Sequence, residues 1–132
     1  MNERKAIVPA GMEAVYEKIR YAPAVKAGNT IYVSGQIGRD LSMQMVEARE
    51  AQIVQAFENL KLVLEAAGAT LSDVVDLTTF HTDMRDLPLF MQVRDRYFTT
   101  DPLPAWTAVG AHMLGGSAGY IVEIKAVAVL AD

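Results

Sequence analysis

The stretch YIVEIKAVAVL, residues 120–130, shows the two-residue alternation that is typical of a β-strand. One face would carry Tyr120, Val122, Ile124, Ala126, Ala128 and Leu130, and the opposite face Ile121, Glu123, Lys125, Val127 and Val129. Both faces are largely apolar, so each of them needs a covering layer. The strand therefore predicts a sheet that is buried on both sides.

Other segments are predicted to supply more strands. Residues 22–36 contain two apolar pieces joined by Ala27-Gly28-Asn29, and Gly and Asn permit the positive φ of a tight hairpin. The stretch SDVVDLTTFHTDM is rich in Val, Thr and Phe and predicts a strand over about residues 74–82. The stretch DPLPAWTAVGAHM, residues 101–113, predicts a Pro-bounded turn that leads into a strand over about 105–113.

Two amphipathic helices are predicted between these strands. The first runs from about Ser42 to Ala67, and its apolar stripe consists of Ile53, Phe57, Leu60, Leu64 and Ala67, with Gly68 to end it. The second begins at Asp86 as N-cap, has Pro88 in its first turn, and presents Phe90, Val93 and Tyr97 on one side. The element order predicts an α+β fold with both helices on one face of the sheet. The other face, with Ile121, Val127 and Val129, then predicts a homo-oligomer.

The bulk composition narrows the classes of function. The 132 residues are 52% hydrophobic and 21% charged, so we expect a single globular domain over 1–132. A net charge of −4 without clustered basic residues makes nucleic acid an unfavoured partner. Cysteine is absent, which excludes disulfides and thiolate chemistry. No apolar run approaches the ~20 residues of a membrane span, and the first residues lack a signal-peptide pattern, so we expect a cytoplasmic protein.

Several familiar kinds of catalytic site find little support. His81 and His112 are the two histidines, and their spacing matches no metal-binding motif, so we expect no metal. Ser34, His81 and Asp83 could be combined into a triad, but no nucleophile elbow surrounds Ser34. The stretch VSGQIG lacks the pattern of a nucleotide-binding loop. Its Ser-Gly-Gln is more typical of a strand end where the backbone must approach another group closely.

Glu123 is the most informative charge because it interrupts an apolar strand. It is either a rim carboxylate paired with basic neighbours or a partly desolvated group that holds a water molecule. In the second case burial would raise its pKa toward working pH. A carboxylate on the face that oligomerises would lie in a cleft between subunits.

Four stretches together resemble one known family. They are AVKAGNTIYVSGQIGRD, AFENLKLVLEAAGATLSDVVDLTTFHTDM, the RYF before the Pro pair, and IVEIKAVAVL. They resemble the Rid family of reactive-intermediate deaminases, also called YjgF-like or endoribonuclease L-PSP, from about Tyr21 to Leu130. The resemblance implies a chorismate-mutase-like fold and a homotrimer whose sheets close into a barrel, with small-molecule clefts between subunits. It also implies hydrolysis of imines and enamines to keto acids and ammonia without a metal or organic cofactor.

The resemblance assigns roles residue by residue. Tyr21 and Ser34 match the pocket tyrosine and serine, Glu123 matches the glutamate that orients water, and the backbone carbonyl near Ala108 would help to place that water. Two positions depart from the pattern. Trp106 stands in Pro-Ala-Trp where the deaminases have a substrate-gripping arginine, and Met91 stands where they have an asparagine. The loop before the last strand is also about two residues longer.

These departures make hydrolysis of the usual 2-imino acids doubtful. An arginine fork grips a carboxylate in a way that an indole does not reproduce, so Trp106 predicts a less acidic or more apolar imine, enamine or related C–N substrate. A tryptophan that only fills volume in the trimer interface is the alternative. The sequence thus leaves a hydrolase and a non-catalytic ligand-binding trimer open. An RNA-cleaving or translation-inhibiting role is less favoured, because no basic stripe is present.

Overall fold

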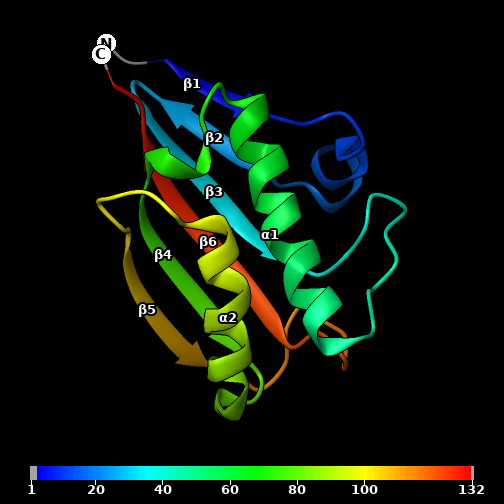
Figure 1. Cartoon of the computed structure of the whole chain (residues 1–132). Coiled ribbons are helices and arrows are strands. Elements are labelled where there is room, and N and C mark those ends of the chain that lie inside the picture. The colour runs from blue at the N-terminus through cyan, green and yellow to red at the C-terminus, as the bar shows by residue number, and fades with distance from the viewer. Residues whose placement is uncertain (1–2, 132) are drawn as a thin grey trace.

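A mixed six-stranded sheet organises the chain (Figure 1). The computed structural model describes residues 3–131. The strands lie in the order β1-β2-β3-β6-β4-β5, and all neighbours are antiparallel except β4 and β5, which are parallel. Their bounds are β1 Arg4–Ile7, β2 Ala24–Ala27, β3 Thr30–Ile37, β4 Val74–His81, β5 Ala105–Gly110 and β6 Val122–Val129.

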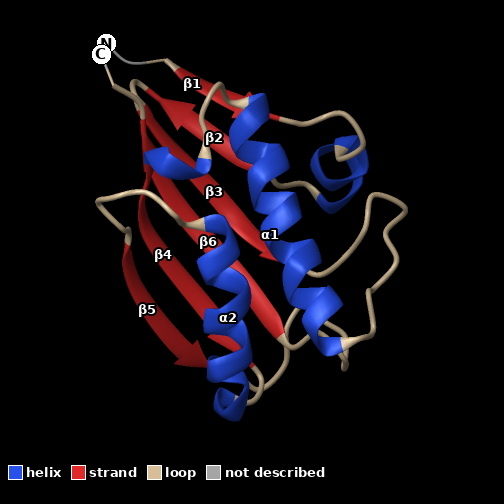
Figure 2. Ribbon diagram, in the orientation of Figure 1, coloured by secondary structure: helices blue, strands red, loops and turns tan. Residues whose placement is uncertain are grey.

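Both long helices, α1 (Arg49–Ala66) and α2 (Leu87–Tyr97), cover the same face of this sheet, as predicted (Figure 2). Every residue of the predicted stripe on the first helix is buried, and so are Phe90 and Val93 of the second. These side chains meet the inward residues of β6, which are Val122, Ile124, Ala126 and Ala128. The main core therefore lies between the helices and the sheet. The chain also forms a π-helical turn, η1 (Val15–Ile19), and the 3₁₀ turns η2 (Leu71–Asp73) and η3 (Met84–Asp86).

The first helix begins at Arg49, so the predicted start near Ser42 was wrong. Asp40 explains the difference, because its Oδ1 accepts hydrogen bonds from the backbone N–H groups of Ser42 (2.8 Å) and Gln44 (3.0 Å). An aspartate side chain that binds the backbone two residues ahead stabilises a turn at the expense of a helix. The turn also places Met43 at a positive φ of 65°.

Asp86 was predicted to cap the second helix, and the structure gives it another role. It occupies the N-cap position, but its side chain makes no capping hydrogen bond and forms an ion pair with Arg49 of α1. Pro88 does lie in the first turn. The ion pair ties the first turns of the two helices together.

Strand ends also differ from the prediction. The strand expected to reach Met113 stops at Gly110, because its partner β4 ends at His81, the residue in register with Gly110. The last strand begins at Val122, and Ile121 packs against the main core cluster, so its expected place on the uncovered face was wrong. Strand β1 was not predicted.

The face away from the helices keeps several large apolar side chains exposed. Alternation along the strands places Tyr32, Val109 and Val129 on it, and 50%, 38% and 42% of their surfaces are accessible. β5 forms one edge of the sheet and has no neighbour on its outer side. A single chain therefore leaves both an apolar sheet face and a strand edge uncovered.

Gln52 fastens two loops to the first helix. Its Nε2 donates to the carbonyl oxygens of Val46 and Gly119, each at 3.0 Å, and its Oε1 accepts from the N–H of Ile121 at 2.6 Å. The residue is fully buried, so no solvent replaces these bonds. One side chain thus anchors the segment after β3 and the segment before β6, which flank the candidate site.

We expect Gln52→Leu to lower the free energy of unfolding by about 2–4 kcal/mol, because it leaves buried backbone groups without partners. Denaturant unfolding monitored by circular dichroism measures this loss. Gln92→Leu on the exposed side of α2 is the matched control and should change stability by less than about 0.5 kcal/mol. Equal stability of the two variants would contradict the anchoring role.

Candidate functional site

Glu123 lies against the backbone of Gly35. In β6 it is in register with Ile37 of β3 and Phe80 of β4, on the face away from the helices. A Cβ atom built on Gly35 would lie 2.2 Å from Glu123 Oε2, so no other residue would fit at this position without a shift. The β3–β6 register shifts between Val33 and Gln36, which places Gly35 in a bulge. This is the close backbone approach that the Ser-Gly-Gln stretch predicted.

The environment of Glu123 favours its protonated form. Its side chain is half-buried, and the resulting desolvation raises the pKa of the carboxyl above its usual range. Lys125, the next residue on the same face, acts in the opposite direction and lowers that pKa. A raised pKa makes a carboxylate a stronger proton acceptor, which suits a group that must accept and return a proton. The rim-carboxylate alternative is disfavoured, since no ion pair involves Glu123 within residues 3–131.

Ser34 fixes the segment that carries Tyr21. Its hydroxyl donates to the carbonyl oxygen of Ala22 at 2.6 Å, and its N–H donates to that of Pro23 at 2.9 Å. The hydroxyl proton is therefore engaged, and Ser34 positions the neighbouring chain rather than acting as a nucleophile. Tyr21 lies at the same pocket as Gly35, with 38% of its surface exposed.

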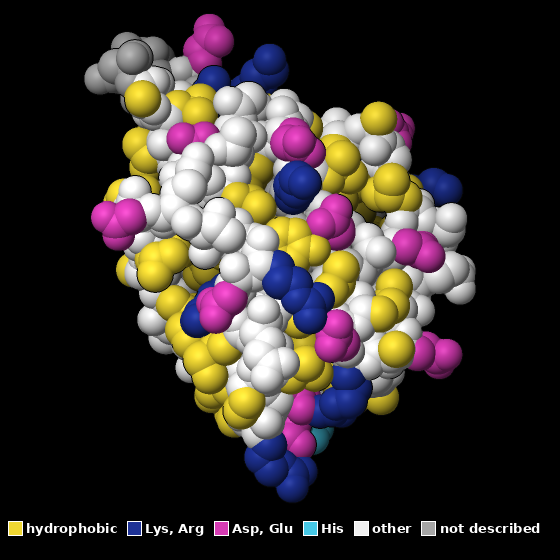
Figure 3. All heavy atoms as spheres, in the orientation of Figure 1, with side chains coloured by type: hydrophobic (Ala, Val, Ile, Leu, Met, Phe, Trp, Pro, Cys, Tyr) yellow, Lys and Arg dark blue, Asp and Glu magenta, His cyan; other side chains and the backbone are white. Residues whose placement is uncertain are grey.

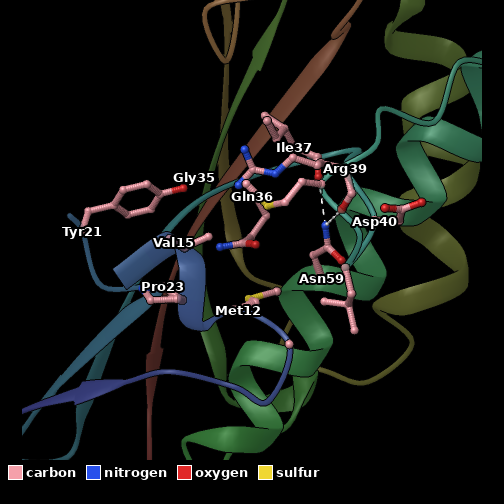
Figure 4. A pocket seen from close by; sticks show the side chains of 13 residues that line it. Met12, Val15, Tyr21, Pro23, Gly35, Gln36, Ile37, Arg39, Asp40 and Asn59 are labelled. Carbon is pink, nitrogen blue, oxygen red and sulfur yellow. Dashed lines mark hydrogen bonds between the residues drawn. The ribbon is translucent and has the colours of Figure 1, made fainter. Parts of the chain in front are cut away.

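A pocket opens beside Gly35 (Figure 4). Within one chain its cavity volume is about 30 Å³, and it opens to solvent. Its apolar wall consists of Met12, Val15, Pro23, Ile37, Leu41 and Met43, and its polar groups come from Tyr21, Gln36, Arg39, Asp40 and Asn59. Convergent polar groups beside an apolar wall are typical of a small-molecule site. Sequence reasoning identified Tyr21 here and missed Arg39, although Arg39 is the second-last residue of the quoted stretch AVKAGNTIYVSGQIGRD.

Trp106 lies elsewhere. It belongs to β5 and packs on the helix-bearing side, where its ring stacks on Phe90 with 5.8 Å between centroids, and the Arg94 guanidinium lies 4.9 Å from its centroid. Met91 and Ala108 were predicted to belong to the same site as Trp106. Met91 lies on α2, and Ala108 lies in the edge strand β5. Within one chain, the predicted site residues thus divide into a Tyr21–Ser34–Glu123 group and a Met91–Trp106–Ala108 group.

The indole also takes part in the hydrogen bonding around His81. Trp106 Nε1 donates to Thr79 Oγ1 at 2.8 Å, which leaves the Thr79 proton available for His81 Nε2 at 2.7 Å. A neutral His81 with its proton on Nδ1 fits this arrangement. Burial lowers the pKa of His81, which agrees with this assignment.

The triad considered from the sequence does not assemble. His81 is buried beneath α2, in edge contact with Phe90, while Ser34 is engaged by Ala22. Asp83 forms hydrogen bonds with Arg85, which lower the pKa of that aspartate to about 2. Among residues 3–131, no group of three or more histidine and acidic side chains is placed to hold a metal ion. No helix in the same range is long and apolar enough to cross a membrane.

Comparison with known proteins agrees with this geometry. Residues 12–130 match the family described as Endoribonuclease L-PSP. The chain belongs to this family. It is 40% identical over 129 residues to the RutC family protein YjgH of Escherichia coli (strain K12), which covers 97% of this chain and 96% of that protein.

One more relative and one solved structure agree with this family. A 2-iminobutanoate/2-iminopropanoate deaminase of Dermatophagoides farinae is 41% identical over 114 residues, which is 83% of this chain and 85% of that protein. A solved structure of Protein YJGH superposes with a TM-score of 0.88 at 38% identity and covers 98% of both chains. The resemblance to the Rid family and the expected YjgF-like α+β fold are thus confirmed.

We expect Gly35→Ala to destabilise the protein by about 1–3 kcal/mol, because the added methyl group must displace the Glu123 carboxylate. Denaturant unfolding measures the change. Gly110→Ala is the matched control, since its Cβ would meet Met84 Cγ at an ordinary 3.7 Å. If both variants are equally stable, the carboxylate is free to move away from Gly35.

We expect the free energy of unfolding to fall as pH is lowered below 6.5, the ordinary pKa of histidine. The unfolded chain binds a proton at His81 in this range and the folded chain does not, so acid favours unfolding by at most about 1.4 kcal/mol per pH unit. Denaturant unfolding at several pH values measures the slope. His81→Gln should reduce it, and His112→Gln, at an exposed position, should not. An unchanged slope in His81→Gln would contradict a buried neutral imidazole.

Proposed function

We propose that this chain is a Rid-type hydrolase of an imine, enamine or related C–N compound, with Glu123 as its acid–base group. The observation that carries the proposal is the half-buried Glu123 carboxylate held against Gly35, a residue that also lines the pocket that contains Tyr21. The 2-iminobutanoate/2-iminopropanoate deaminase named among the relatives supports this reaction class.

The proposed steps use one water molecule and no cofactor. Glu123 takes a proton from water as the water oxygen attacks the imine carbon, and returns that proton to the imine nitrogen to give a carbinolamine. Glu123 then takes the hydroxyl proton and gives it to the amine nitrogen as the C–N bond breaks, so that a carbonyl compound forms and ammonia leaves. An enamine is first protonated on carbon to give the imine. A carboxyl with a raised pKa suits both directions of proton transfer.

The proposed site is completed by a second copy of the chain. Tyr21, Ser34 and Glu123 lie in one part of the sheet, while Met91 and Trp106 lie at its β5 edge, so a cleft with both groups needs two subunits. The uncovered apolar face and the free β5 edge support a homotrimer with such clefts. The backbone carbonyl of Ala108, in this edge strand, would then help to place the water.

The substrate we propose differs from the usual 2-imino acids. Trp106 replaces the arginine of the deaminase pattern, and its N–H is already bound to Thr79. The same observation favours the second candidate, a non-catalytic ligand-binding trimer. A role in RNA cleavage has less support, because basic side chains are interspersed with acidic ones on the helix-bearing face (Figure 3) and the net charge is −4.

We expect Glu123→Gln to reduce hydrolysis at least about 100-fold while the fold is kept, since it removes the proton acceptor and preserves side-chain volume. The assay follows the decay of a panel of imines by semicarbazide trapping, and the 2-imino acids made by a pyridoxal-dependent dehydratase form one part of that panel. The wild-type kcat/KM should rise with pH through a pKa above that of an ordinary glutamate. Glu65→Gln, on the exposed side of α1, is the matched control.

Two results would count against this assignment. Full activity in Glu123→Gln would remove the proposed base. Binding of imine-derived ligands by the wild type without any turnover would favour the ligand-binding trimer. Light scattering on each variant checks that the assembly is unchanged, so that loss of activity is not loss of subunit contact.

A further inference from the structure

Arg39 is the one cation among the residues that line the Gly35 pocket in the described part of the chain. It follows β3 directly, four residues after Gly35. Figure 4 shows its guanidinium reaching back toward Gly35, while the Tyr21 ring points toward Gly35 from the other direction. The positive charge therefore lies at the pocket and is not directed into bulk solvent.

The backbone that carries Arg39 is held rigidly. The buried Asn59 side chain of α1 donates from Nδ2 to the carbonyl oxygens of Ile37 (3.0 Å) and Arg39 (2.7 Å). Arg39 also forms an isolated antiparallel bridge with Met45. Fixed backbone on both sides limits the positions that the guanidinium can reach, and so lowers the entropy lost when it binds a ligand.

The Arg39 guanidinium has no hydrogen-bond or ion-pair partner within residues 3–131. Its neighbour Asp40 is engaged by the backbone of the following turn, and in Figure 4 its carboxylate points away from the pocket. Elsewhere the structure pairs arginines with carboxylates, as in Arg49–Asp86 and Arg96–Glu50. An unpaired, half-buried guanidinium at a pocket is suited to bind a carboxylate through two parallel hydrogen bonds.

We infer that Arg39 binds the carboxylate of an anionic ligand in the Gly35 pocket and so determines the substrate class of this site. This inference rests on the proposed function. Gly35 adjoins both groups, because its backbone lines the pocket that holds Arg39 and the Glu123 carboxylate lies against its Cα. The anion is then held from within the same chain, away from the β5 edge that carries Trp106. The substrate inferred here is an anionic C–N compound, in place of the less acidic one that Trp106 alone predicts, and its charge is held in a different place from that expected of the Pro-Ala-Arg arrangement.

Binding of 2-oxobutanoate and its neutral methyl ester to the full chain tests this inference without requiring turnover. Isothermal titration calorimetry should show that the wild type binds the carboxylate about 10- to 100-fold more tightly than the ester, as expected for a charge-assisted pair. Arg39→Met should bring the two affinities within about threefold of each other. Arg39→Lys should keep part of the preference, because it retains the charge and loses the fork.

Arg4→Met is the matched control, because it removes the same charge from an exposed position in β1 outside the pocket. It should keep the carboxylate preference, and thermal unfolding should show that all variants are folded. An unchanged preference in Arg39→Met, or a wild type that does not prefer the carboxylate, would overturn the inference. A failure of the proposed function is distinguishable from a failure of this inference. The proposed function fails if Glu123→Gln keeps full turnover, and the binding results of the Arg39 variants do not affect that outcome.

Discussion

The pairing of β6 with β3 on one side and β4 on the other is the constraint on which this structure depends. Successive side chains of β6 point to opposite faces of the sheet, so one face packs in the core and the other carries the candidate site. Ile124 and Ala126 complete the core under the helices, while Glu123, which precedes Ile124 and lies on the opposite face, meets the bulge at Gly35. Hydrogen bonding on both edges leaves the strand little freedom to slide, because a shift of one residue would exchange the two faces. The carboxylate is therefore placed by the same contacts that stabilise the fold.

The two groups of candidate residues differ in how many of their polar and aromatic groups find a partner within one chain. Trp106 has a hydrogen-bond acceptor in Thr79, a stacking partner in Phe90 and a cation over its ring in Arg94. Such an indole is held in place without a ligand. Glu123 has a raised pKa and no ion pair within the described residues. Unsatisfied groups beside a pocket are available for chemistry, which is the physical reason that the proposed reaction is assigned to the Gly35 side of the sheet.

The replacement of an arginine by tryptophan changes where charge can be bound. An anion clamp does not need a particular strand, only a guanidinium that is free of acidic partners and held close to the reacting group. Asn59 fixes the Arg39 backbone and Asp40 is engaged by its own turn, so Arg39 meets the first condition and lies at the pocket that includes Gly35. Under the inference drawn above, the end of the pocket that carries the charge determines the substrate.

Local patterns in the sequence determined most elements of the fold. The alternation in residues 120–130 and the apolar stripe of the first helix depend only on residues that are near one another along the chain, so both can be recognised from the sequence alone. The helix start near Ser42 failed, because a single Asp40 side chain outcompeted helical hydrogen bonding. The site divides in the same way. The sequence indicated Glu123 and the close approach at the Ser-Gly-Gln stretch, but only the tertiary structure decided that Trp106 turns toward α2 and that Arg39 reaches back to Gly35. Those directions are set by packing between segments far apart in sequence, which no local pattern records.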